Sequence, residues 1–77
     1  MTSPEEIQRS LAGAFPDAEI EAEDSTGGGD HFAVRITSAS FAGRSLVERH
    51  QMVYRALGAL MPRIHALQLK TQAPGES

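Results

Sequence analysis

The sequence predicts an α+β domain in which two amphipathic helices cover one face of a three-stranded mixed sheet. Two capped helix patterns and three short strand patterns follow in the order helix, strand, strand, helix, strand. The 77 residues suffice for one small domain with a modest core. Packing both helices on the same face of the sheet would bury both apolar helix stripes, which favours this layered arrangement.

The first helix is predicted to begin after Ser3 and to end before Pro16. Ser3 is a favourable N-cap and forms a capping box with Glu6. Proline cannot continue a helix, so Pro16 closes it. The apolar residues at helical spacing are Ile7, Leu11, Ala14 and Phe15.

Two strands follow and are expected to form a hairpin. Residues 18–23 alternate strictly between apolar and acidic side chains, which predicts a strand with one solvated face. The second strand spans residues 31–38. Residues 24–30, DSTGGGD, form the turn, where consecutive glycines are either flexible or at positive φ. The core-facing residues of the second strand are Phe32, Val34 and Ile36.

The second helix is predicted to begin after Ser45, which forms another capping box with Glu48, and to end at Pro62. The third strand then covers residues 64–71. The residues assigned to the apolar helix stripe are Leu46, Val47, His50, Val53, Tyr54, Leu57, Leu60 and Met61.

The remaining residues complete the domain organisation. Residues 1–72 are predicted to form the domain, and the polar residues 73–77 a flexible C-terminal tail. The chain has no cysteine, a net charge of -3 and no apolar run long enough to span a membrane. We expect a cytoplasmic protein that is a monomer when alone.

Few side chains suggest catalysis or cation binding. The acidic run is interpreted as a solvated strand face; it comprises Glu19, Glu21, Glu23 and Asp24. No nucleophile with a positioned base is evident, so we expect no enzymatic activity.

Two histidines are the candidate ligands, because a small acidic domain with histidines and no cysteine suggests one half of a shared metal site. His65 opens the third strand and His31 follows the glycine run. Their separation has no local metal-binding spacing. Alternative interpretations remain open: His65 as a packed strand residue, and His31 as a solvated turn residue beside Asp30.

Three segments resemble the BolA family. They are FAGRSLVERHQMVY at residues 41–54, IHALQLKT at residues 64–71, and TGGGDHFAV at residues 26–34. The resemblance implies an α-β-β-α-β core related to type II KH domains. The chain differs from many relatives after the last strand, where they continue with a Thr-Pro-acidic-Trp helical turn and this sequence reads QAPGES.

The resemblance implies a monothiol glutaredoxin as partner. In such complexes a [2Fe-2S] cluster bridges the two proteins, with ligands from a glutaredoxin cysteine, from glutathione and from the BolA protein. The family's final-strand histidine matches His65, and the second ligand comes from the loop before the second strand, where His31 is the candidate. No cofactor is expected in the isolated protein.

The alternative function is a KH-like, nucleic-acid-binding transcriptional regulator. KH domains clamp nucleotides with a GXXG loop, whereas the corresponding connector here contains only Gly43. Basic residues crowd the C-terminal half and could form a nucleic-acid or partner face, so weak DNA binding is retained as an alternative. The residues assigned to this face are Arg44, Arg49, Arg55, Arg63 and Lys70.

Overall fold

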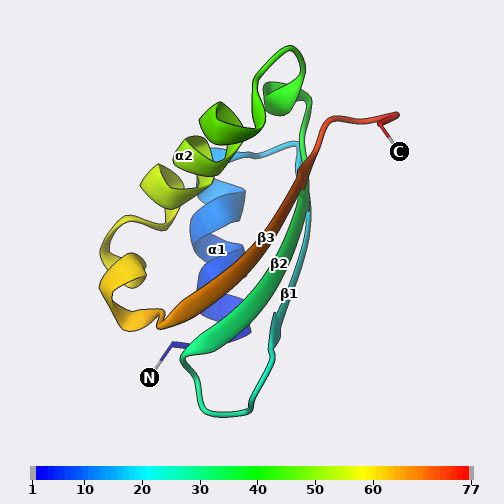
Figure 1. The fold of residues 1–77 in the computed structure, drawn as a ribbon. Coiled ribbons are helices and arrows are strands. Elements are labelled where there is room, and N and C mark those ends of the chain that lie inside the picture. Colours follow the sequence, from blue (N-terminus) through cyan, green and yellow to red (C-terminus); the bar gives the residue numbers. More distant parts are fainter. Residues whose placement is uncertain (1, 77) are drawn as a thin grey trace.

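The computed structural model describes residues 2–76 and confirms the predicted α+β fold. Two helices lie on one face of a three-stranded sheet (Figure 1). No helix within these residues combines the length and apolar character needed to cross a membrane. The elements in chain order are α1 (Pro4–Ala14), β1 (Glu19–Asp24), β2 (His31–Thr37), η1 (Ala39–Phe41), α2 (Leu46–Leu57), η2 (Gly58–Arg63) and β3 (Ala66–Gln72), where η denotes a 3-10 helix.

The sheet has the strand order β1-β2-β3, with β2 in the centre. β1 and β2 form the predicted antiparallel hairpin, and β3 pairs with β2 in parallel. Alternate residues of β2 are buried against the helices, so the residues between them point to the opposite, open face. The cross-strand register extends this open face over Glu19, Glu21, Glu23, Ala33, Arg35, Gln68 and Lys70.

The core lies between the sheet and the two helices. Both helices contribute through residues four apart: Ile7 and Leu11 on α1, and Val53 and Leu57 on α2. The Phe15 and Phe41 rings meet with their centroids 5.2 Å apart. The buried apolar residues are Ile7, Leu11, Phe15, Phe32, Val34, Ile36, Phe41, Val53, Leu57 and Ala73.

Both predicted capping boxes are present at the helix N-termini. The Ser3 hydroxyl accepts from the Glu6 backbone N–H, and the Glu6 carboxylate accepts from the Ser3 N–H. Ser45 and Glu48 repeat the arrangement at α2. Each box satisfies two N–H groups that the helix itself cannot pair. The sequence therefore predicted both helix starts correctly.

The predicted end of the second helix was wrong. α2 ends at Leu57, five residues before Pro62, because Gly58 takes a positive φ of 50° that breaks the helical hydrogen-bond pattern. The chain continues as the 3-10 helix η2, which contains Pro62. A glycine therefore ends this helix, and the proline lies in the turn that leads to β3.

The predicted apolar stripe of α2 was also too wide. Val53 and Leu57 are buried, but Tyr54 is 40% exposed and Leu46 and Val47 are 64% and 66% exposed. Val47 and Tyr54 lie seven residues apart and therefore share one face of the helix, which is adjacent to the face that carries Val53 and Leu57. Leu46 belongs to the first turn of α2, which contributes no buried residue.

Residues 73–76 make specific contacts after β3. Ala73 is buried, and a turn with Gly75 at a φ of 85° brings Glu76 back toward α2. The Glu76 carboxylate accepts two hydrogen bonds from the Arg49 guanidinium, at 2.7 and 2.8 Å, and one from the Ala73 N–H. The Arg49 hydrogen bonds, followed by the Ala73 bond, lower the pKa of Glu76 to about 2. The flexibility of residues 73–77 stays a prediction.

Candidate functional site

His31 and His65 lie together at one end of the sheet. Parallel pairing aligns His31, the first residue of β2, with Ala66, the first residue of β3, and His65 immediately precedes Ala66. The two imidazole rings have centroids 5.0 Å apart and planes inclined by 59°. The His31 side chain is 37% exposed, and His65 is exposed as well. The structure thus joins two histidines that the sequence could only name separately.

The main chain fixes His65 although it precedes β3, which begins two residues later than predicted. Its N–H donates to the Asp30 carbonyl oxygen over 2.7 Å, and the Ala66 N–H donates to the same oxygen over 3.2 Å. These bonds anchor the start of β3 on the residue just before β2. His65 is therefore held by its own backbone while its side chain remains accessible to a partner.

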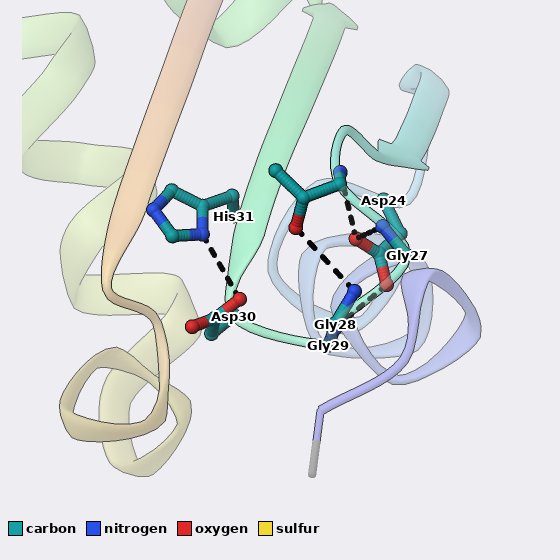
Figure 2. Close-up of polar contacts among 7 residues, drawn as sticks. Asp24, Gly27, Gly28, Gly29, Asp30 and His31 are labelled. Atoms are coloured by element: carbon teal, nitrogen blue, oxygen red, sulfur yellow. Dashed lines mark hydrogen bonds and ion pairs between the residues drawn. The ribbon is translucent and has the colours of Figure 1, made fainter.

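The Asp30 carboxylate holds the His31 ring. Its Oδ1 atom lies 2.9 Å from His31 Nδ1 (Figure 2). The pKa of Asp30 is lowered, chiefly by the hydrogen bond with His31. Desolvation raises this pKa, and electrostatic interactions with His31 and His65 lower it further. The carboxylate is therefore ionised at neutral pH and can only accept, so Nδ1 donates and Nε2 is left free.

The glycine loop before His31 is organised around a second carboxylate. Asp24 accepts hydrogen bonds from the N–H groups of Gly27 at 2.9 Å, Gly29 at 2.8 Å and Thr26 at 3.3 Å, as Figure 2 shows for the glycines. Gly27 and Gly29 adopt φ values of 80° and 77°, which is one of the two alternatives that the sequence left open for this turn. The interpretation of Asp24 as part of a solvated strand face was wrong, because its carboxylate binds this loop.

Asp24 and Asp30 are the residues of this site that the sequence analysis missed as contributors. Their only signal in the sequence was their position at the two ends of the segment DSTGGGD. Aspartates beside glycines commonly hydrogen-bond nearby backbone N–H groups. That pattern identifies a turn, but it does not reveal that Asp30 contacts His31.

The two imidazoles form an incomplete ligand set. Within residues 2–76, no group of three or more histidine, cysteine, aspartate or glutamate side chains is arranged to hold a metal ion. A tetrahedral metal centre takes about four ligands. His31 and His65 could therefore bind a metal centre only together with ligands from another molecule.

The basic residues assigned to a second interface are divided between the sheet, which carries Lys70, and the helix layer with the turn before it, which carries the other four. Lys70 pairs with Arg35 across the strands and shares the open face of the sheet with it, whereas Arg55 belongs to α2. Arg49 is held by Glu76, with its side chain only 13% exposed. Longer ion pairs join Arg44 to Glu48 at 3.8 Å, Arg63 to Glu6 at 3.9 Å and Arg35 to Glu21 at 3.7 Å.

Comparisons with known proteins agree with this architecture. The family model described as BolA-like protein matches residues 8–76. The Arabidopsis thaliana protein BOLA2 is 39% identical over 71 residues, which cover 91% of this chain and 76% of that protein.

Solved structures show the same arrangement. A bol-like protein from Babesia bovis superposes with a TM-score of 0.87 and 32% identity, covering 97% of this chain and 88% of that one. The BolA domain of SufE1 from Arabidopsis thaliana gives a TM-score of 0.84 at 33% identity, covering 96% and 94%. The sequence match to SufE-like protein 1 of that plant covers only 14% of its length, so the domain there is part of a longer protein. Family model, relatives and fold agree, and the chain belongs to the BolA family.

Proposed function

We propose that this protein is a non-enzymatic partner of a monothiol glutaredoxin and that His31 and His65 supply ligands to a [2Fe-2S] cluster shared between them. The observation that carries the proposal is the meeting of two accessible imidazole rings, with centroids 5.0 Å apart, at one end of the sheet. These are the two positions at which the family resemblance implies ligands. The cluster is the cargo of the complex and not a resident cofactor.

The donor set suits a shared iron centre. Neutral imidazole binds iron, and histidines in place of cysteines on one iron raise the reduction potential, as in Rieske centres. The partner's cysteine and glutathione would provide the thiolate ligands. Because protonated imidazole cannot coordinate, histidine ligands would be released more readily in acid than thiolates. Such a centre is suited to trafficking or to sensing of iron and redox state.

The exposure of the site and its incomplete set of ligands support binding to a partner protein. The two histidines are insufficient for a complete metal centre, and His65 is exposed at the end of the sheet. A related domain also occurs within a longer protein, SufE-like protein 1. A domain that offers ligands at an accessible edge is appropriate for a protein that completes another protein's metal site.

Two features of residues 2–76 count against the nucleic-acid alternative. The positive side chains are divided between the open face and the helix layer, and several are paired with carboxylates. The connector after β2 contains η1 and a single glycine, Gly43, in place of a GXXG loop. We therefore advance the cluster-sharing function alone.

The decisive experiment is reconstitution with a monothiol glutaredoxin, glutathione, iron and sulfide. We expect a 1:1 complex with a visible absorption and circular dichroism spectrum different from that of the glutaredoxin alone. The variants His31→Ala and His65→Ala should lose or alter this spectrum. His50→Gln is the matched control, because His50 is the remaining histidine and lies in α2. An unchanged spectrum in both alanine variants would contradict the proposal.

A further inference from the structure

We propose that Asp30 is the positioning residue of this site: its carboxylate selects Nε2 of His31 as the ligand atom, and its carbonyl holds His65 beside it. This inference rests on the proposed function, because it assigns to Asp30 a role in arranging the ligands. It adds a residue that contacts both histidines and that would not itself bind the metal.

The side-chain contact determines which nitrogen of His31 is available. A neutral imidazole has one N–H and one lone pair, and the hydrogen bond of one nitrogen fixes the role of the other. Oδ1 of Asp30 lies 2.9 Å from Nδ1 of His31. The carboxylate accepts a hydrogen bond from the Nδ1–H group, so the lone pair resides on Nε2.

The same contact restricts the direction of the ring. A carboxylate that accepts a hydrogen bond from the N–H of a metal-binding histidine orients the imidazole and raises its basicity. His31 and Asp30 are adjacent in the chain, and both side chains are partly exposed, at 37% and 48%. Neighbouring atoms therefore enclose the His31 ring only in part, and the hydrogen bond to Asp30 restricts its rotation.

The main-chain contact of Asp30 acts on the other histidine. Its carbonyl oxygen accepts from the N–H groups of His65, at 2.7 Å, and of Ala66, at 3.2 Å. One residue thus connects the two ligands, through its side chain to His31 and through its backbone to His65. A substitution of Asp30 removes the first connection and retains the second, so the side-chain role can be tested with β3 still anchored.

The first experiment measures the tautomer of His31 in the isolated protein. In ¹⁵N-labelled wild type, at a pH where the imidazole is neutral, we expect long-range ¹H–¹⁵N correlations to show the Nδ1–H form in excess. Asp30→Ala should shift His31 toward the Nε2–H form that free imidazole side chains favour. His50, which lies in α2, serves as the internal reference in the same spectra. A wild-type His31 mainly in the Nε2–H form would overturn the inference without any variant being made.

The second experiment measures how firmly the cluster is held in the complex with a monothiol glutaredoxin. Loss of an outer carboxylate partner typically weakens metal binding about 10–100-fold. We expect a chelator to remove the cluster from the Asp30→Ala complex faster by a factor in that range. Glu23→Ala is the matched control, because it removes an exposed carboxylate on neighbouring β1. Equal release from the Asp30→Ala and wild-type complexes would contradict the inference.

The two hypotheses fail in different ways. If His31→Ala and His65→Ala alter the spectrum while Asp30→Ala changes neither the tautomer nor the release rate, the proposed function stands and the role of Asp30 is rejected. If both histidine variants retain the wild-type spectrum, the proposed function is rejected whatever the tautomer. Amide spectra of Asp30→Ala verify that β2 and β3 remain paired in the variant.

Discussion

The two histidines are held by different atoms of the same residue, Asp30. His65 is fixed by its backbone N–H, whereas His31 is the first residue of β2 and its ring is hydrogen-bonded to Asp30. Because the structure places His31 in a strand, its backbone is better positioned than that of a residue in a mobile loop would be. Preorganised ligands need less ordering when a partner arrives.

His65→Ala is expected to abolish the cluster spectrum of the complex with little change in the fold. The side chain is exposed, and its backbone N–H remains available to donate to Asp30 after the substitution. Surface substitutions of this kind usually change stability by no more than about 0.5 kcal/mol. Reconstitution and a thermal melt of the same sample check both parts. A wild-type spectrum would show that His65 is not a ligand.

His31→Cys is expected to give a cluster that resists acid better than the wild-type cluster. Imidazole leaves a metal when it is protonated, whereas a coordinated thiolate is harder to protonate. Stopped-flow absorbance after a drop in pH compares the two release rates. Equal release from the two complexes would mean that residue 31 does not bind the cluster.

Single-residue chemistry was only partly predictable from the sequence. The histidines were identifiable because the composition offers few other ligands and the resemblance aligns both positions. The roles of Asp24 and Asp30 were not, because they depend on the path of the glycine loop. Asp24 faces three N–H groups only after Gly27 and Gly29 have taken positive φ values.

At the scale of elements, the starts of the helices were predictable and the end of the second was not. A capping box is a local pattern in which Ser45 and Glu48 each satisfy the other's backbone N–H. The end of α2 depends on a choice between Gly58 and Pro62, either of which can stop a helix. The structure stops α2 at Gly58, whose φ is 50°, and Pro62 lies within η2; a linear pattern does not show which of the two ends the helix.

Leu57→Ala is expected to destabilise the protein by about 2–5 kcal/mol, the range for large-to-small core substitutions. Leu57 is the last residue of α2 and is 2% exposed within the core. Leu46→Ala, at a site 64% exposed on the same helix, is the control and should cost far less. Urea unfolding of both variants gives the comparison. Equal stabilities would show that α2 does not bury Leu57.

Glu76→Gln is expected to destabilise the protein at neutral pH and to have a smaller effect in acid. The pKa of Glu76 is lowered to about 2 by its hydrogen bonds to Arg49 and Ala73, from an ordinary value of 4.5. A lowered carboxyl pKa stabilises the folded state above the ordinary value, and the contribution disappears as the pH falls from 4.5 toward 2. Thermal melts across this interval measure the difference between variant and wild type. A difference that does not depend on pH would mean that the ion pair contributes no stability.

At the scale of the whole molecule, the distribution of charge bears on the choice of partner. The acidic strand β1 and the basic residues Arg35 and Lys70 lie side by side on the open face of the sheet. Arg55 and Arg63 belong to the helix layer. The net charge is -3, and the basic residues of the described part of the chain are divided between the sheet and the helix layer, which disfavours strong attraction to a nucleic-acid backbone.

We therefore predict that duplex DNA binds this protein weakly and without sequence preference. Non-specific binding typically has a Kd of about 10⁻⁴–10⁻⁶ M at physiological salt, and this chain should lie at the weak end because few phosphates can be neutralised at once. Fluorescence anisotropy at several salt concentrations measures affinity and salt dependence. Lys70→Glu on the open face and Arg55→Glu on α2 are a matched pair, each reversing one charge on a different side of the molecule. Both should weaken binding slightly and equally. Tight, sequence-selective binding that only one of them abolishes would identify a nucleic-acid face and make regulation of transcription the better explanation.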